Sequence, residues 1–287
     1  MGWYANKKVF VVGGSKGIGR EVAVQLAAQG ANVVVAARGQ AELDEAVAAM
    51  KAVGGADQVF GSVAFDVRDA AAVKQQADKV LELLGGLDVL LCNSGYAQPG
   101  YAHEVSADTY RNMIEVNYLG HVHAVQAFLP HFRAQQHGNI CLVSSMMGFL
   151  PLYGYTAYSG SKFAIVGFAE ALRQELAPVG VHVSVYYPPT TDTPGLAEEN
   201  KTKPEDVWML ESESAFSATF SAKDVAKHLI GHVESQRFDG LPGALNALIY
   251  FIARHLPGLT RWMSDGEVKT ARRKVAEKHA AAGTASA

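Results

Sequence analysis

The stretch Val9-Phe-Val-Val-Gly-Gly-Ser-Lys-Gly-Ile-Gly19 decides the fold of this chain. Its apolar start predicts a buried strand, and the glycines that follow predict a tight turn that opens a helix. Glycine lets backbone N–H groups approach a pyrophosphate closely, and the positive end of the helix dipole attracts the negative charge. We therefore predict a dinucleotide site here. Its predicted cofactor-binding residues are Gly13, Ser15, Lys16, Gly17, Ile18 and Gly19.

Short apolar runs alternate with alanine-rich helical stretches along the rest of the chain. The predicted strands are residues 9–12, 33–37, 59–65, 89–92, 140–143 and 181–186. Near-continuous apolar strands separated by helices are typical of a parallel sheet that is covered on both faces. We predict an α/β fold with a single doubly wound (Rossmann-type) parallel sheet, helices on both faces and a C-terminal helical extension.

The pattern predicts three parts. A dinucleotide-binding domain covers residues 1–240 and includes a polar, loop-rich segment at 190–222. An apolar and then basic helical extension covers 241–280, and a disordered tail covers 281–287.

Composition excludes several classes of protein. The net charge of −3 over 287 residues argues against a chain-wide basic surface, so no nucleic-acid partner is predicted. Cys92 and Cys141 fall in apolar runs and are expected to be buried strand thiols in a reducing compartment, so we predict no disulfide and no metal site. The N-terminus lacks the apolar region of a signal peptide, and we expect a cytoplasmic protein.

The end of the second predicted strand indicates which dinucleotide is bound. An acid there would bind a free ribose 2′-hydroxyl, whereas a base accommodates a 2′-phosphate. The sequence has Ala36-Ala37-Arg38 at this point, and Lys16 adds a second positive charge from the glycine loop. We therefore predict NADPH/NADP as the cofactor. Asp66, before Val67 at the end of the third strand, is expected to bind the adenine amino group or to cap the next helix.

Tyr158 and Lys162 lie four residues apart on a predicted helix, so their side chains share one face. A cation beside a phenol favours the phenolate, and we expect the pKa of Tyr158 to fall from about 10 towards neutrality. A phenol of that kind can exchange protons at working pH.

With these motifs in order, the chain resembles the short-chain dehydrogenase/reductase family over roughly residues 7–195. The glycine loop matches the family's Gly-x-x-x-Gly-x-Gly, and Cys92-Asn93-Ser94-Gly95 is similar to its Asn-Asn-Ala-Gly segment. Ser145 lies 13 residues before Tyr158, the usual separation in the family, which favours it over Ser144. The predicted cofactor-binding residues therefore also include Arg38, Asp66 and Val67 at the strand ends. The resemblance adds Asn93, Gly95, Tyr158, Lys162, Pro188 and Thr193.

The resemblance also implies the catalytic residues Asn117, Ser145, Tyr158 and Lys162. Ser145 would hydrogen-bond the substrate carbonyl oxygen, and Tyr158 would donate the proton. Lys162 would lower the pKa of the phenol and hold the nicotinamide ribose. Asn117 would anchor a water that relays protons to Lys162.

The segment from Tyr186 to Pro204 resembles the 3-ketodihydrosphingosine reductases within that family, through Thr191-Asp-Thr-Pro-Gly and Glu198-Glu-Asn. The resemblance implies NADPH-dependent reduction of 3-ketodihydrosphingosine (3-dehydrosphinganine) to dihydrosphingosine (sphinganine) in sphingolipid biosynthesis. The alternatives are reduction of another hydrophobic ketone, a steroid or a 3-oxoacyl lipid, and, more distantly, a non-catalytic NADPH-binding regulator. A sphingoid base carries an ammonium, and the carboxylates that could pair with it are those of Asp192, Glu198 and Glu199.

Residues 241–254 are apolar around most of the circumference of a helix, but the run is shorter than the ~20 residues needed to cross a membrane. Basic residues follow it, namely Lys269, Arg272, Arg273, Lys274 and Lys278. Three roles stay open for 241–280: a peripheral contact with a membrane, burial against a second subunit, or the lining of an acyl-chain tunnel. The family resemblance implies a homo-oligomer, either a dimer or a tetramer.

Overall fold

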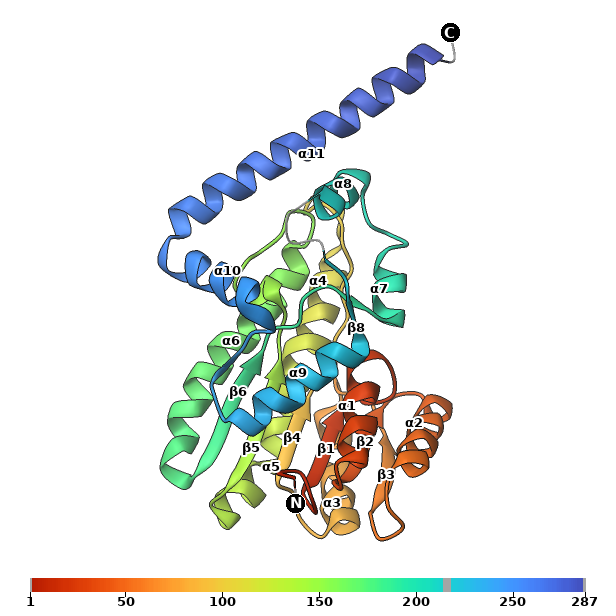
Figure 1. The fold of residues 1–287 in the computed structure, drawn as a ribbon, viewed down its shortest axis with the longest axis vertical. Helices are drawn as coiled ribbons and strands as arrows, with labels where there is room; N and C mark the ends of the chain where they lie inside the picture. The colour runs from red at the N-terminus through yellow and green to blue at the C-terminus, as the bar shows by residue number, and fades with distance from the viewer. Residues whose placement is uncertain (1, 214–217, 286–287) are drawn as a thin grey trace.

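The computed structural model describes residues 2–213 and 218–285, which form one central sheet between two layers of helices (Figure 1). Seven parallel strands of the described chain make up this sheet, in the order β3-β2-β1-β4-β5-β6-β9. The strands are β1 (Lys8–Val12), β2 (Asn32–Ala37), β3 (Phe60–Ala64), β4 (Val89–Cys92), β5 (Gly138–Val143), β6 (Val181–Tyr186) and β9 (Asp239–Gly240). The predicted doubly wound α/β fold is confirmed.

Two apolar cores, one on each face of the sheet, explain why the strands carry almost no polar residues. In β1, Val9 and Val11 pack against one face and Phe10 and Val12 against the other. Helices α1 (Gly17–Ala28), α2 (Gln40–Val53) and α9 (Ala222–Ser235) cover the first face. Helices α3 (Ala70–Leu84), α5 (Gly120–Gln135) and α6 (Thr156–Leu176) cover the second. Successive strand residues point to opposite faces, so covering both faces requires an apolar residue at each position.

Cys92 and Cys141 are buried free thiols on β4 and β5, as the sequence predicts. Burial raises the pKa of the Cys141 thiol to about 12. Both thiols therefore stay protonated and pack as small apolar groups.

The strand order reverses between β1 and β4, and the loops after these strands separate at the carboxyl edge of the sheet. In doubly wound sheets this reversal is where ligands bind. Short helices carry the chain across the same edge: α4 (Ala107–Met113), the π-helix η1 (Ile114–Leu119) and the 3-10 helix η2 (Met146–Gly148). The 3-10 helix η3 (Ala177–Val179) instead joins the end of α6 to the start of β6, at the opposite edge.

The polar segment at 190–222 is more ordered than the predicted loop. It contains β7 (Thr191–Asp192), α7 (Pro194–Glu199), α8 (Glu205–Glu213) and β8 (Phe220–Ser221), while 214–217 lie outside the described residues. Thr193 begins α7 as its N-cap, because its Oγ1 accepts a hydrogen bond from the Leu196 amide at 3.2 Å.

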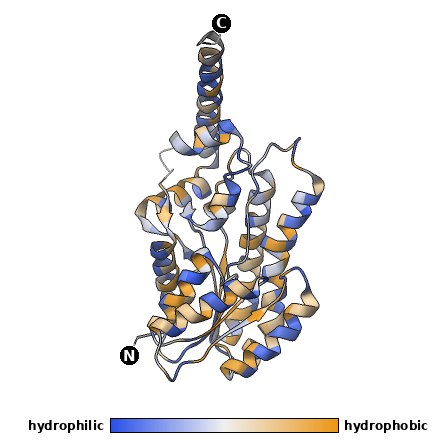
Figure 2. Cartoon of the chain, turned by 90° about the vertical axis from the view of Figure 1, so that its right-hand side faces the viewer, coloured by the Kyte–Doolittle hydropathy of each residue, from blue (hydrophilic) through white to orange (hydrophobic). Residues whose placement is uncertain are grey.

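The C-terminal extension consists of α10 (Gly243–His255) and α11 (Pro257–Ala285). Helix α11 lies against α8, where Glu205 pairs with Lys278 and His279, and then projects beyond the rest of the chain (Figure 1). Figure 2 shows the same projection after a quarter turn. Residues 281–285 are helical where we expected a disordered tail, because a run rich in alanine favours helix; 286–287 lie outside the described residues. No helix of the described chain is both long and apolar enough to span a bilayer.

Candidate active site

A cavity of about 1450 Å³ opens at the carboxyl edge of the sheet and joins the predicted cofactor residues to the predicted catalytic ones. Every predicted site residue lines it except Gly19 and Asn117, which lie behind its wall. The cavity continues past the sheet to α10 and α11, which contribute Ile249, Ile252 and Met263. One continuous cleft therefore runs from the glycine loop to the C-terminal helices.

The glycine loop is held by contacts that leave no room for side chains. Gly13 has a φ of +80°, and a Cβ there would lie 2.7 Å from the Ser94 amide nitrogen. A Cβ on Gly19 would lie 2.1 Å from the Gly13 carbonyl oxygen, so Gly19 lets α1 pack closely under the loop. Asn93 Nδ2 donates to that same carbonyl at 3.0 Å. The structure thus gives Gly19 and Asn93 a supporting position behind the predicted phosphate site.

The N-terminus of α1 is the element best suited to a phosphate. No side chain caps it, so the amides of its first turn at Gly17 and Ile18 are left for a ligand in the cavity. The amides of Gly13 and Gly14 are already used, since both donate to the Ala36 carbonyl at 2.8 and 3.0 Å. A diphosphate fits the free amides of the helix start.

The predicted 2′-phosphate site contains an acidic side chain as well as the two basic side chains that the sequence indicated. Arg38 and Lys16 both line the cavity, but Lys16 Nζ pairs with Glu42 at 2.9 Å. The hydrogen bond from Lys16 lowers the pKa of the Glu42 carboxyl below its usual value. Glu42 was missed, although its place in the first turn of α2, four residues after Arg38, is visible in the sequence.

Asp66 is engaged by a side chain that the sequence prediction also missed. Arg68 Nε and its terminal nitrogen donate to both oxygens of the Asp66 carboxylate, at distances down to 2.6 Å. These hydrogen bonds hold the pKa of Asp66 below its usual value. The alternative of a helix cap is wrong, because Asp69 caps α3 by accepting from the amides of Ala71 and Ala72.

Tyr158 and Lys162 lie side by side on α6, with Lys162 Nζ 5.6 Å from the centre of the phenol ring. Burial lowers the pKa of Lys162 to about 7. Burial also raises the pKa of Tyr158 above its ordinary value, although a hydrogen bond with Ser145 acts the other way. The expected fall in the Tyr158 pKa is therefore wrong for the chain alone, because the loss of water around the buried phenol is the largest effect on its pKa.

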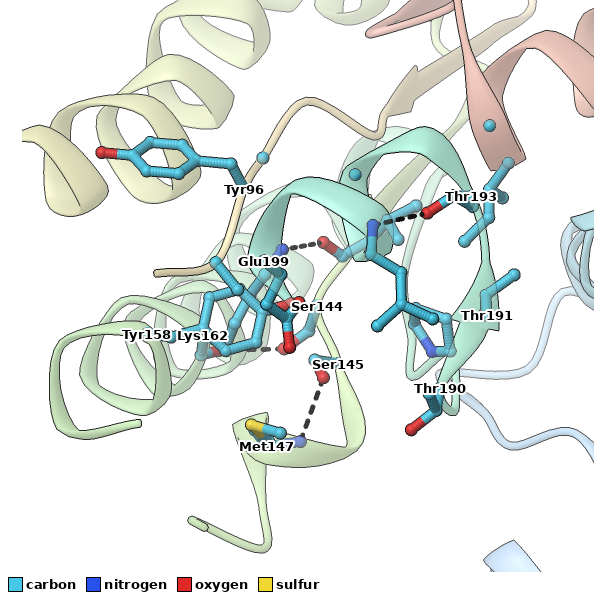
Figure 3. A pocket seen from close by; sticks show the side chains of 18 of the residues that line it. Tyr96, Ser144, Ser145, Met147, Tyr158, Lys162, Thr190, Thr191, Thr193 and Glu199 are labelled. Carbon is cyan, nitrogen blue, oxygen red and sulfur yellow. Dashed lines mark hydrogen bonds between the residues drawn. The ribbon is translucent and has the colours of Figure 1, made fainter. Parts of the chain in front are cut away.

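The two adjacent serines have different partners (Figure 3). Ser144 Oγ donates to the Lys162 carbonyl at 3.0 Å and so joins the loop after β5 to α6. Ser145 Oγ accepts from the Met147 amide at 3.2 Å and is hydrogen-bonded to Tyr158. Ser145 is thus the serine placed at the Tyr158 phenol.

Asn117 is fully buried in η1, a π-helix, an irregularity that often marks functional sites. Its Nδ2 donates to the Tyr96 carbonyl at 3.0 Å and to Ser161 Oγ at 2.9 Å, and its Oδ1 accepts from the Tyr96 amide at 3.0 Å. Asn117 therefore ties the loop after β4 to α6. Its role as a water anchor stays a prediction.

His121 is a buried neighbour that no sequence motif indicated. Its Nε2 lies 2.9 Å from the Ser94 carbonyl, and its pKa is lowered to about 3 by burial and then by the charge of Lys162. The ring is neutral at working pH and holds the segment that carries Gly95. A Cβ on Gly95 would lie 3.2 Å from Asn117 Oδ1 and 3.3 Å from Lys162 Nζ, so a side chain here would require these groups to shift by a few tenths of an ångström.

Comparison with known proteins agrees with this geometry. The profile of the short chain dehydrogenase family matches residues 7–204. The chain belongs to the short chain dehydrogenase family. This short chain dehydrogenase is 40% identical to the 3-dehydrosphinganine reductase of Danio rerio over 211 residues, which are 73% of this chain and 64% of that protein. It is 37% identical to the 3-ketodihydrosphingosine reductase of Mus musculus over 82% of this chain and 71% of that protein.

A solved structure supports the same assignment of fold. The short chain dehydrogenase from Burkholderia cenocepacia J2315, determined in complex with NADP, superposes with a TM-score of 0.72 at 28% identity. The match covers 83% of this short chain dehydrogenase and 96% of that chain.

Proposed function

We propose that this chain reduces 3-ketodihydrosphingosine to sphinganine with NADPH, as a step of sphingolipid biosynthesis. The observation that carries the proposal is the continuity of one cavity from the glycine loop, past Tyr158, to an apolar far part. Residues from η2, the loop after it, α10 and α11 line that part: Met146, Leu150, Leu152, Ile249, Ile252 and Met263. A long alkyl chain would bury its surface there. The names of the relatives support this choice of substrate.

The residues at the sheet edge fit a phosphorylated dinucleotide. The open amides of α1 would take the diphosphate, and Arg38 with Lys16 would take the 2′-phosphate. Pro188, Thr193 and Lys162 would hold the nicotinamide end. When bound, NADPH supplies the hydride that the carbonyl carbon receives.

The side chains of this site would supply a hydrogen bond and a proton. Ser145 donates a hydrogen bond to the carbonyl oxygen and stabilises the negative charge that develops on it. Tyr158 gives that oxygen a proton, and its raised pKa keeps the phenol protonated until it is needed. Lys162, with a pKa near 7, exchanges protons close to neutral pH and returns one to the phenolate.

Product formation from three ketones with matched NADPH tests the proposal. We expect kcat/KM for 3-ketodihydrosphingosine to exceed the values for a steroid ketone and for a 3-oxoacyl ester. Equal or higher values for either of the other ketones would contradict the substrate assignment, but would still support NADPH-dependent ketone reduction. Tight NADPH binding with no turnover of any ketone would favour the regulator.

We also propose that α10 and α11 contact a lipid surface with their outer side. On α10, Ile249 lies towards the cavity, whereas Leu248 and Phe251 are each 54% exposed. On α11, Trp262 is 74% exposed. An apolar surface next to basic residues fits the surface of an anionic bilayer, from which a lipid substrate could enter the cavity.

Co-sedimentation with vesicles tests this contact. We expect binding to vesicles that contain phosphatidylserine, and reduced binding for the double variant Phe251→Glu, Trp262→Glu. Light scattering at several protein concentrations tests the other occupant, a second copy of the chain, together with the predicted dimer or tetramer. A dimer that the double variant dissociates, without vesicle binding by the wild type, would assign the surface to the subunit interface.

A further inference from the structure

A cluster of four side chains lies beside the reacting phenol, and the predicted chemistry does not use it. Tyr155 and Lys203 are buried, and Glu199 and Glu211 are partly buried. Lys203, with only 1% of its side chain exposed, is in hydrogen-bond contact with the carboxylate of Glu211 and lies 3.6 Å from Glu199 Oε1. The Tyr155 hydroxyl contacts both carboxylates, as donor to Glu199 and to Glu211. The cluster therefore joins α6, α7, α8 and the turn between α7 and α8.

The charges of this cluster do not balance. Two carboxylates face one ammonium, which leaves one negative charge, and Lys203 lies closer to Glu211 than to Glu199. Tyr155 has one hydroxyl hydrogen, so it can fully satisfy only one of the two carboxylates at a time. Buried carboxylates without enough donors are unstable, and burial raises the pKa of Glu199. One further cation with hydrogen-bond donors would complete the cluster.

The side of the cluster that lacks a donor belongs to the catalytic cavity. Glu199, Asn200, Lys203 and Glu211 all line the cavity that Tyr158 lines. Figure 3 shows Glu199 near Tyr158 and Ser145, and the ring centres of Tyr155 and Tyr158 are 6.3 Å apart. Asn200 Oδ1 is buried and has no hydrogen-bond partner among the described residues, so the residue after Glu199 carries an unsatisfied acceptor.

The other two carboxylates of this segment are less suited to a ligand. Asp192 is exposed and does not line the cavity. Glu198 has 72% of its side chain exposed and pairs with Lys201 at 2.6 Å. Among the three acids, the charge that acts on the Tyr158 phenol is that of Glu199.

We infer that Glu199 binds the ammonium of an amino ketone and thereby selects it, an inference that rests on the proposed function. In a 2-amino-3-ketone the ammonium is carried by the carbon next to the carbonyl. A carbonyl oxygen held by Ser145 and Tyr158 therefore keeps the ammonium within a few ångströms of the reacting phenol. Glu199 supplies the charge and Asn200 Oδ1 a further acceptor, while Tyr155 and Lys203 fix the position of the carboxylate.

The test compares kcat/KM for 3-ketodihydrosphingosine with kcat/KM for the same ketone without its amino group. A hydrogen-bonded charge pair predicts that the wild type prefers the amino ketone by roughly 10- to 100-fold. We expect Glu199→Gln to bring this ratio close to one. Glu198→Gln, the adjacent exposed carboxylate, is the matched control and should keep the wild-type ratio.

A wild-type ratio near one would overturn the inference, and this measurement needs no variant to fold. A Glu199→Gln protein with an unchanged melting temperature and the wild-type ratio would also overturn it. The des-amino ketone is still a long-chain ketone. If it were reduced at the same rate as the amino ketone, the inference about Glu199 would be contradicted, but the proposed ketone reductase activity would not. If the protein reduces neither ketone, the result would instead contradict the proposed function.

Discussion

Replacing the buried Lys162 by methionine is predicted to stabilise the protein in a way that depends on pH. The side chain is almost fully buried, and its pKa is lowered from 10.5 to about 7. Between these two values the unfolded chain binds a proton that the folded chain does not bind. Stability of the wild type therefore rises with pH in this window, and the penalty is fully present below about pH 7.

The size of the effect follows from these two pKa values. The lysine destabilises the folded wild type by roughly 4 kcal/mol at about pH 7.5 and by roughly 1 kcal/mol at about pH 9.5. Lys162→Met removes this contribution. The variant's gain in unfolding free energy over the wild type should therefore shrink by roughly 2 to 3 kcal/mol between the two pH values.

Urea unfolding of both proteins at the two pH values measures this difference. The lost hydrogen bond from Lys162 Nζ to the Val143 carbonyl, and any change in packing, shift both measurements equally and cancel. Lys74→Met, at an exposed lysine on α3, is the matched control and should show no such change with pH. A stability difference between Lys162→Met and the wild type that stays constant from pH 7.5 to 9.5 would refute the assignment of a mostly neutral buried lysine.

Three further predictions concern the loop, the cofactor and the serines. Gly19→Ala should weaken NADPH binding at least about 10-fold in calorimetry, because its Cβ would overlap the loop backbone at 2.1 Å; unchanged affinity would contradict this packing. Glu42→Gln should tighten NADPH binding roughly 2- to 5-fold by freeing Lys16 and leave NADH unchanged, and an equal effect on both cofactors would argue against Lys16 at the 2′-phosphate. Ser145→Ala should lower kcat by about 100-fold, whereas Ser144→Ala should mainly lower the melting temperature; similar kinetics of the two variants would contradict the assignment.

The sheet could be predicted because its strands are buried on both faces. Runs such as Val9 to Val12 have no polar residue at either parity, which is typical only of strands covered on both sides. The glycine loop could also be located from the sequence. Its glycines lie between the first strand and the first helix, where the chain must make a tight turn and close backbone contacts. The tail at 281–285 could not, because composition alone does not separate a disordered tail from a helix end.

The electrostatics of the site could not be predicted from spacing. The positions of Tyr158 and Lys162 follow from the helix repeat, but their pKa values depend on burial, and burial comes from packing of the whole cavity. The choice of Glu199 over Asp192 and Glu198 likewise depends on exposure. A buried partner such as Lys203 is visible only when α7 and α8 are folded together.

The measurement that tests the central claim most directly is NADPH oxidation with 3-ketodihydrosphingosine, in the wild type and in Tyr158→Phe. We predict rapid oxidation that yields sphinganine and falls by about 10²- to 10⁴-fold in the variant, while NADPH still binds. Equal rates in the two proteins would contradict the account, because the phenol would then not be the proton donor in this cavity.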